Sequence, residues 1–401
     1  MRTAGLLTLL LPLITLVKTA YDTDIELTGD FSKYENNPAE NGLRTNFLGN
    51  GASSQVRKFY VDLENIEMKK TINLVEKQPS PVAVKIFNTN AERAMGQEID
   101  VLAYIRSKGI KEIIPEIYRY GRTNNNSPFI IMELLDGDLF NYIKRRGANL
   151  SLEEKFNMYI KLAGLLEKLH YAGIVHCDVK LENIGVIRTV PLTLKLLDFN
   201  LSTPAKKCTG GTGGYVAPEI TKEDSITGDG VFKSDIYSLG IMLFTIEVGT
   251  NEINTLNTQQ NDMKANNFVY NQVNDWILKK YDRFYGSERK PSTFADFVTS
   301  ISLALQVVIV STLKSDIIDR PTARMLGKGL RCFKSLYGKI ETLNRHYEIV
   351  NFEDAIEFAY KLPFKIDVNN IEATDMLISD FVERFEGRII ASVNNNKIRL
   401  I

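Results

Sequence analysis

The hydrophobic pattern of this chain changes its period partway along, and that change limits the folds the chain can adopt. Residues 43–87 alternate apolar and polar positions around a glycine-containing turn, as β-strands do. Residues 91–107, residues 151–171 and most of the chain after Ser234 instead show the 3.6-residue period of helices. A strand-rich first part followed by a helix-rich second part predicts an α+β chain with two lobes and a cleft between them.

Composition excludes several classes of protein. The 401 residues carry 49 basic and 49 acidic side chains, and apolar residues make up 44% and charged residues 24% of the chain. These proportions are typical of folded soluble proteins, so a disordered, collagen-like or polytopic membrane chain is excluded. Balanced charge creates no strong field for DNA or RNA, so no nucleic-acid partner is expected. The oligomeric state stays open.

The first 20 residues have the layout of a secretory signal peptide. A positive amino-terminal region precedes an apolar run from Leu6 to Val17, and Thr19 and Ala20 supply small residues before a polar segment. The run is shorter than the about 20 residues that a spanning helix needs, and Pro12 interrupts it. We therefore expect export through the secretory pathway, with an uncleaved membrane anchor as the alternative. Residues 21–42 are predicted to form a loose arm.

The rest of the chain adds little that would define a compartment. An apolar stretch at residues 297–313 contains several polar residues, which favours a buried helix over a membrane span. The small, odd number of cysteines predicts no disulfide framework. Three Asn-x-Ser triplets are candidate glycosylation sites. These cysteines and triplets are Cys177, Cys208 and Cys332, and Asn125, Asn149 and Asn200.

A glycine-containing turn lies at residues 48–56, which read Leu-Gly-Asn-Gly-Ala-Ser-Ser-Gln-Val. Glycines at such a turn let backbone amides approach a phosphate with no Cβ in the way. A hairpin turn without a ligand is an equal alternative. About thirty residues later, Ala83 and Lys85 share one face of a predicted strand, and Glu98 lies thirteen residues after Lys85 in a helical stretch. This spacing predicts a Lys85–Glu98 ion pair that orients the lysine.

The strongest motif is His-Cys-Asp-Val-Lys-Leu-Glu-Asn at residues 176–183, which Leu-Asp-Phe-Asn follows at residues 197–200. Here the sequence resembles the eukaryotic protein kinases. Three more landmarks of that family follow in order: residues 211–219 end in Ala-Pro-Glu, residues 235–240 read Asp-Ile-Tyr-Ser-Leu-Gly, and residues 319–321 read Asp-Arg-Pro. The resemblance covers residues 43–336 and implies a bilobal kinase fold, with an N-lobe to about residue 135 and a C-lobe from about residue 136. Residues 337–401 are predicted to be a helical extension.

The resemblance implies a role for each motif residue in phosphoryl transfer from ATP. Asp178 would accept or orient the proton of the substrate hydroxyl, and Lys180 would balance charge on the transferring group. Asn183 and Asp198 would hold Mg²⁺. Leu102, His176 and Phe199 would be stacked core residues, and Arg320 would pair with Glu219. The catalytic set is therefore Asp178, Lys180, Lys85 and Glu98.

The nucleotide site follows from the same resemblance. Lys85 would grip the α and β phosphates of ATP, and the loop from Gly49 to Val56 would cover them. Met132 would guard the back of the adenine pocket, and the backbone after it would bind the base. The residues implied at this site are Leu48, Gly49, Gly51, Val56, Ala83, Lys85, Met132, Glu133, Leu135, Asn183 and Asp198.

The acceptor is expected to be a serine or threonine hydroxyl of a protein whose identity stays open. A lysine two residues after the catalytic aspartate, as at Lys180, is typical of the Ser/Thr kinases. Glu182 matches an acid that reads basic residues in some members, but Thr245 stands where those members often have a second acid. The alternatives are a nucleotide-binding pseudokinase or scaffold, and a kinase that acts on a non-protein hydroxyl.

Three residues depart from the family pattern. Cys177 replaces the arginine that often pairs with a phosphorylated activation loop, so we expect activity without loop phosphorylation at Thr209; the Cys177 thiol is expected to be buried and inert, with a redox role as the alternative. Asn200 replaces a glycine, but asparagine tolerates positive φ, so the metal-binding turn should survive and Asn200 should stay unglycosylated. Gly185 replaces a larger apolar residue beneath the adenine, which predicts weaker nucleotide affinity.

Overall fold

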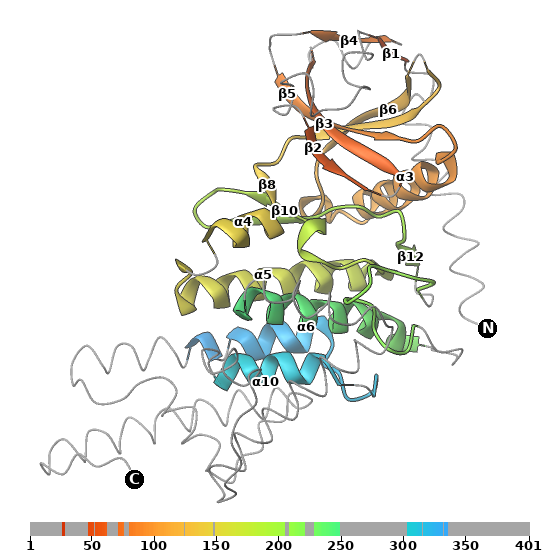
Figure 1. Cartoon of the computed structure of the whole chain (residues 1–401). Helices are drawn as coiled ribbons and strands as arrows, with labels where there is room; N and C mark the ends of the chain where they lie inside the picture. The colour runs from red at the N-terminus through yellow and green to blue at the C-terminus, as the bar shows by residue number, and fades with distance from the viewer. Residues whose placement is uncertain are drawn as a thin grey trace, which may run out of the picture. The chain divides into compact units, whose positions relative to one another are not determined.

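We analysed a computed structural model of the chain (Figure 1). The structure describes residues 26–28, 47–51, 53–61, 71–75, 80–123, 125–146, 149–204, 208–220, 228–248, 303–314, 316–331 and 333–335. The predicted signal peptide, nearly all of the arm, the insertion around residues 251–289 and the carboxyl-terminal extension lie outside the described residues. The chain divides into two compact units: residues 1–142 with 171–204, and residues 143–170 with 205–401.

The first unit is built on a seven-stranded sheet, which Figure 1 shows in red to yellow with helix α3 beside it. Its strands are β1 (Glu26–Thr28), β2 (Phe47–Asn50), β3 (Ser54–Val61), β4 (Thr71–Val75), β5 (Ser80–Phe87), β6 (Ile117–Thr123) and β7 (Pro128–Glu133). The pairings β3–β5, β5–β7, β7–β6, β6–β1, β1–β4 and β4–β3 return to the strand from which they start. The sheet is therefore closed, and β2 is attached to it through β3 alone.

Alternation of side chains gives this sheet its core. Every second residue of the central strands points to one face, as the two-residue period of a strand requires. The buried cluster formed in this way consists of Phe59, Val61, Val82, Val84, Ile86, Phe129 and Ile131. The opposite face of β5 carries Ala83 and Lys85, so the same alternation that builds the core sets these two side chains apart from it.

Helix α3 (Glu92–Ser107) follows β5 after a short turn. Its buried residues recur with helical spacing and include Glu98 among apolar neighbours such as Ile99 and Leu102. The 3-10 turn η3 (Lys111–Ile113) then leads into β6. A buried glutamate on an otherwise apolar helix face needs a charged partner, so this position already marks a site.

The remainder of the first unit is made of short elements that carry the kinase-like motifs. These are β8 (Gly137–Asp138), β9 (Ile174–Val175), η5 (Leu181–Asn183), β10 (Ile184–Ile187), β11 (Thr193–Leu196) and β12 (Thr203–Pro204). Strand β10 pairs with β11 on one side and β8 on the other, and β12 pairs with β9. Residues 176–183 therefore lie between β9 and β10 in the chain. Each of these strands is paired with other strands, and this pairing fixes both ends of the segment.

The second unit is helical. Its elements are α5 (Leu152–Tyr171), η6 (Gly228–Phe232), α6 (Lys233–Val248) and α10 (Leu303–Thr312), and α4 (Leu139–Arg146) spans the boundary between the units. Helices α6 and α10 pack closely, because a Cβ at Gly240 of α6 would overlap the side chain of Thr312. The described part of the apolar stretch at residues 297–313 is this α10, and Leu305, Val308 and Ile309 are buried. Its prediction as a buried helix is thus confirmed.

These elements agree with the expected α+β fold, a β-rich unit and a helical one. Among the described residues, no helix combines the length and the apolar character that crossing a bilayer requires.

Candidate active site

Lys85 lies on β5, between the two strands that pair with β5. Lys85 lies opposite Val56 of β3 and Ile130 of β7, while Ala83 lies opposite Met132 two residues earlier. The side chain of Lys85 is 6% exposed. Val56, Ala83 and Lys85, which the sequence assigned to the nucleotide site, are therefore brought together by the pairing of β3 with β5.

Two carboxylates meet the ammonium group of Lys85. Its Nζ lies 2.9 Å from Oε1 and 2.7 Å from Oε2 of Glu98, and 2.9 Å from Oδ1 of Asp198. The predicted Lys85–Glu98 pair is confirmed. Asp198 adds a second carboxylate from a point 113 residues away in the sequence. Its side chain is 27% exposed, so this end of the cluster is open to a ligand whereas the Glu98 end is closed.

Electrostatics keep this lysine charged. Burial lowers the pKa of the Lys85 ammonium group, but the charges of Glu98 and Asp198 outweigh burial and hold that pKa above its ordinary value. Burial raises the pKa of the Glu98 carboxyl group, and Lys85 lowers it in part. Because desolvating both groups costs free energy, the pair fixes the position of Lys85 more than it stabilises the fold.

Backbone and ring contacts fix the segment that carries Asp198. Phe199 is 1% exposed, and its ring centroid lies 5.0 Å from that of His176, as expected for stacked core residues. Asp198 itself has φ 61°, in the left-handed region. Asn200 is not among the residues with positive φ, so the expectation that its tolerance of that conformation preserves the turn was wrong. Asp198, which accepts a hydrogen bond from Lys85, adopts the left-handed backbone conformation in this turn.

The His176 ring links two segments of the site. Its Nε2 lies 3.0 Å from the carbonyl oxygen of Leu197, and the backbone N–H of Asp178 donates to its Nδ1 at 3.3 Å. A carbonyl oxygen only accepts, so Nε2 carries the proton and Nδ1 is the acceptor. The neutral ring therefore holds the residue before Asp198 and the backbone of Asp178 at the same time.

The loop at residues 178–183 is organised around Asp178. The Asn183 Nδ2 group donates to the Asp178 carbonyl oxygen at 2.8 Å and to its Oδ2 at 2.9 Å, and Lys180 Nζ lies 3.0 Å from Oδ2. Asp178 is 7% exposed. Its carboxylate thus lies beside a cation and is held in one orientation, as a residue that positions a hydroxyl requires.

Asn183 and Asp198 have the donor chemistry that Mg²⁺ prefers. Magnesium takes oxygen ligands, usually one or two from the protein with water and phosphate oxygens completing the set. The Asn183 NH₂ group donates to Asp178, which leaves the side-chain oxygen of Asn183 as an acceptor. Asp198 uses Oδ1 for Lys85 and retains a second carboxylate oxygen. These residues fit the ion.

The glycine-containing turn is the hairpin between β2 and β3. Gly49 lies opposite Val56, and the Gly51 N–H donates to the Ser54 carbonyl at 2.7 Å. Neither glycine has a positive φ, and a Cβ would meet open space at Gly49 and only ordinary contacts at Gly51. The hairpin itself does not require glycine at either position, which favours close approach of a ligand over a plain turn.

Strand β7 leads into the segment proposed to bind the base. Met132 and Glu133 are half-buried at its end, and Leu135 follows. Glu133 Oε2 accepts from Lys195 Nζ of β11 and from the Glu116 N–H at 3.0 Å. Sequence reasoning missed both partners, because separations of 62 and 17 residues leave no periodic signal.

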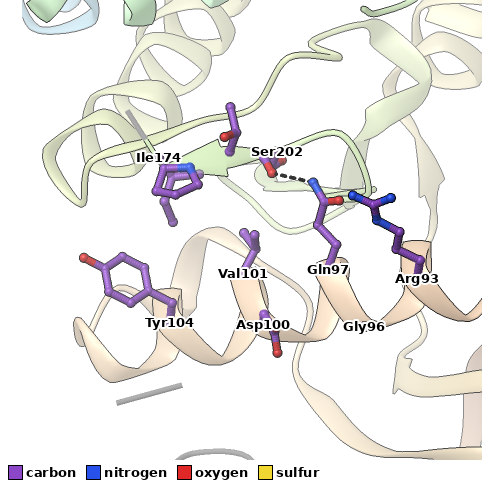
Figure 2. Close-up of a pocket in the computed structure, with 10 residues that line it drawn as sticks. Arg93, Gly96, Gln97, Asp100, Val101, Tyr104, Ile174 and Ser202 are labelled. Carbon is purple, nitrogen blue, oxygen red and sulfur yellow. Dashed lines mark hydrogen bonds between the residues drawn. The ribbon is translucent and has the colours of Figure 1, made fainter. Parts of the chain in front are cut away.

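A second contact missed from the sequence joins α3 to the segment after Asp198. Figure 2 shows Gln97 extending from α3 toward Ser202, where its Nε2 donates to the backbone carbonyl at 3.0 Å. The contact lies in a cavity of about 460 Å³ that Val101, Tyr104 and Ile174 also line. Gln97 directly precedes Glu98, so one bond couples the two segments that supply carboxylates to Lys85.

Cys177 differs from its expected state. Cys177 in the first unit and Cys208 in the second are each disulfide-bonded. The prediction of an inert buried thiol at Cys177 is therefore wrong. Spacing within the sequence gave no sign of it, since only three cysteines are present.

In the second unit, the predicted Glu219–Arg320 pair is confirmed. Arg320 NH1 lies 2.6 Å from Glu219 Oε1 and NH2 lies 2.7 Å from Oε2, a bidentate arrangement across 101 residues. The arginine is fully buried, and it also donates to the Lys314 and Lys233 carbonyls. Its guanidinium lies 5.0 Å from the centre of the Tyr237 ring. All three guanidinium nitrogens donate a hydrogen bond, as a buried cation requires.

Comparison with known proteins agrees with this geometry. The testis-specific serine/threonine-protein kinase 2 of Mus musculus is 27% identical over 217 residues, 51% of this chain and 55% of that protein. The serine/threonine-protein kinase cds1 of Schizosaccharomyces pombe is 32% identical over 178 residues, 40% of this chain and 36% of that protein. The serine/threonine-protein kinase PLK4 of Nematostella vectensis is 28% identical over 216 residues, 50% of this chain and 20% of that protein.

The chain thus spans from a fifth to about half of the length of these curated relatives. A family model described as the protein kinase domain matches residues 44–329, well over half of the chain. Members of this family use ATP and Mg²⁺. The chain belongs to the protein kinase domain family.

Proposed function

We propose that this chain is an ATP-dependent protein kinase that transfers the γ-phosphoryl group of ATP to serine or threonine hydroxyls of protein substrates. The observation that carries the proposal is the convergence of Glu98 and Asp198 on Lys85 within 2.9 Å. Relatives named serine/threonine-protein kinases support the acceptor class. Lys180, two residues after Asp178, supports it as well.

Lys85 binds the α and β phosphates in this proposal. Its buried ammonium group is held by Glu98 from the closed side, so a phosphate pair approaches from the side of Asp198. Because its position is fixed in advance, little reorganisation is needed when the nucleotide binds. The hairpin from Gly49 to Val56 lies on the strand next to Lys85 and covers the phosphates with backbone N–H groups.

Asn183 and Asp198 would hold the magnesium. When bound, Mg²⁺ would supply positive charge against the negative charge that develops on the phosphate during transfer. Asp178 orients the acceptor hydroxyl and takes its proton, and the Asn183 amide holds the carboxylate in place for that task. Lys180 lies 3.0 Å from the same carboxylate and places a positive charge beside the transferring group.

A nucleotide-binding pseudokinase is the competing function, and the complete charged set argues against it. Asp178 and Lys180, which lie 3.0 Å apart, serve the transfer step and are not needed for simple nucleotide binding. We therefore favour catalysis.

Transfer of labelled phosphate from ATP to a generic protein substrate tests the proposal. Wild type should label the substrate, and Asp178→Asn should reduce the rate at least about 1000-fold, as loss of a catalytic base and its positioning predicts. Glu153→Gln, an exposed acid on α5, is the matched control and should retain wild-type rates. Label in phosphotyrosine alone would contradict the acceptor class. Consumption of ATP only with a small-molecule extract would favour a non-protein hydroxyl.

We also propose that the chain enters the secretory pathway through residues 1–20, as their sequence indicates. Amino-terminal sequencing of the mature chain from cells that express a carboxyl-terminal tag should find a new terminus near Tyr21. A chain that retains Met1 in a membrane fraction would support the anchored alternative instead.

A further inference from the structure

The strongest unexplained position in the site is Gly185, on β10 beneath the region assigned to the base. Gly185 is buried, and it lies opposite Lys195 of β11 and Asp138 of β8. Its φ is outside the left-handed region, so its backbone conformation is open to any residue. Strand geometry therefore does not explain the glycine.

The side chain of Leu135 explains it. A Cβ added at Gly185 would overlap Leu135 Cδ1 more closely than real Cβ contacts allow, and it would lie 3.3 Å from both Cδ atoms of Leu197. The tip of Leu135 thus occupies the space that a side chain at position 185 needs. A glycine is required there because the leucine enters from another segment.

Main-chain bonds hold Leu135 in this position. The N–H of the next residue, Asp136, donates to the Val186 carbonyl at 2.9 Å, and the Asp136 carboxylate accepts from the Arg188 N–H at 2.7 Å. Pairing of β8 with β10 continues the connection. The approach of the Leu135 backbone to Gly185 is therefore part of the fold, and it places the leucine side chain within reach of the space above the glycine.

Leu135 also keeps part of its apolar surface exposed. Leu135 and Leu197 are only half-buried, although Gly185 between them is covered. Leu197 directly precedes Asp198, and Leu135 follows the β7 residue Met132 by three positions. Exposed apolar area in the two segments assigned to the nucleotide site suits the flat face of a purine, which needs a hydrophobic surface to leave water.

We infer that Leu135 supplies the apolar floor for the nucleotide base in this protein, in the place that a side chain at position 185 would otherwise take. The inference rests on the proposed function and adds the residue that sets affinity for the base. It also replaces the expectation that Gly185 weakens nucleotide binding, because the missing side chain is compensated from the segment after β7.

Calorimetric titration of the full chain with ATP and with inorganic tripolyphosphate, both with Mg²⁺, tests the inference. Tripolyphosphate has the phosphates without the base. Leu135→Ala should weaken ATP binding about tenfold, the size expected when a few methylene contacts are lost. It should leave the affinity for tripolyphosphate unchanged. Leu192→Ala, a half-buried leucine between β10 and β11, is the control and should change neither.

A double variant tests whether a leucine at position 185 can take the place of Leu135. Gly185→Leu alone should lose ATP binding or fail to fold, because its side chain overlaps Leu135. Leu135→Ala combined with Gly185→Leu should fold and recover most of the ATP affinity lost in Leu135→Ala. A double variant that binds ATP no better than Leu135→Ala would overturn the exchange.

The outcomes separate this inference from the proposed function. Wild type that binds neither ATP nor tripolyphosphate overturns both. Wild type that binds ATP, with Leu135→Ala binding it equally well, overturns the role of Leu135 and leaves the kinase proposal standing. Equal losses for ATP and tripolyphosphate in Leu135→Ala would mean that the leucine maintains the shape of the site and makes no contact with the base.

Discussion

A single lysine shows how this protein uses burial for chemistry. Lys85 lies on the face of β5 that the core does not use, and two carboxylates keep its pKa raised despite burial. An ordinary surface lysine would stay charged without help but would not stay in one place. The free energy spent on desolvating the cluster yields a fixed cation.

Replacing this lysine tests that account. Lys85→Met should leave Glu98 buried without its cation and lower the free energy of unfolding by about 3 kcal/mol, the usual cost of breaking a buried pair. ATP binding should weaken as well. Urea unfolding and calorimetric titration measure the two effects. Lys111→Met on an exposed turn is the matched control and should change neither. Full ATP affinity in Lys85→Met would contradict the role of this residue.

Thr209 is the residue at which we test whether activity depends on phosphorylation of the activation loop. It is exposed, and Cys177, which stands where a phosphate-pairing arginine is expected, is disulfide-bonded and carries no charge. Thr209→Ala should therefore retain activity within about twofold of wild type, because surface substitutions without special contacts have small effects. A labelled-ATP assay checks this. Abolished turnover in Thr209→Ala alone would show that loop phosphorylation is required.

At the scale of elements, helix α5 begins with a reciprocal cap. The Ser151 N–H and hydroxyl both donate to Glu154 Oε2, at 2.9 and 3.0 Å, and the Glu154 N–H donates back to the Ser151 hydroxyl at 3.2 Å. The bond from the Ser151 backbone, followed by that from its side chain, lowers the pKa of the Glu154 carboxyl group. A capping box of this kind fixes where the helix starts.

This cap gives a pH-dependent prediction. Ser151→Ala should lower the free energy of unfolding by about 1 kcal/mol near neutral pH. Because the folded pKa of Glu154 is depressed, its contribution is present above the unfolded value and is lost as the pH falls through the folded value. The gap between wild type and Ser151→Ala should therefore narrow in acid, where the bond from the serine hydroxyl to the carboxylate is lost, and what remains comes from the Glu154 N–H bond to the serine hydroxyl. Urea unfolding at several pH values measures the gap, and a gap that is constant with pH would exclude a role for the carboxylate.

The hydrogen bond from Gln97 to Ser202 joins helix α3 to the segment after Asp198. Gln97→Ala removes the bond to the Ser202 carbonyl while leaving Glu98 on its helix. Loosening the two carboxylate-bearing segments should lower kcat severalfold, since small misplacements near a reacting group cost rate. Arg93→Ala, one turn earlier on α3 and exposed, is the control. Steady-state kinetics with ATP measure the change, and an unchanged kcat in Gln97→Ala would show that the bond is dispensable.

At the scale of the whole molecule, the sequence predicted the fold class from its hydrophobic periods and the main site residues from its ordered motifs. The two periods predicted a strand-rich part and a helical part, and the motifs located Lys85, Glu98, Asp178, Asn183 and Asp198. Contacts of Lys195 with Glu133 and of Gln97 with Ser202 escaped prediction, because they join residues 62 and 105 positions apart and follow no period. The exchange between Leu135 and Gly185 escaped for the same reason, since it depends on packing in three dimensions.

The Glu219–Arg320 pair is the long-range contact that the family pattern did predict, and it tests global stability. Glu219→Gln should lower the free energy of unfolding by about 3 kcal/mol, because a fully buried guanidinium loses its charged partner. Glu219→Leu with Arg320→Met should cost less than the single change, since both charges are then removed. Urea unfolding compares the two. A single variant as stable as wild type would show that the pair contributes nothing.

The returning order of strand pairings has a consequence for how the chain behaves in a crowded compartment. Within the described strands of the sheet, the outer side of β2 is the place where another chain could add a strand, because every other strand has neighbours on both sides. Exposed sheet edges are templates for association between molecules. Closure through β1 and β4 therefore leaves the outer side of β2 as the edge of this sheet at which two copies of the protein could pair.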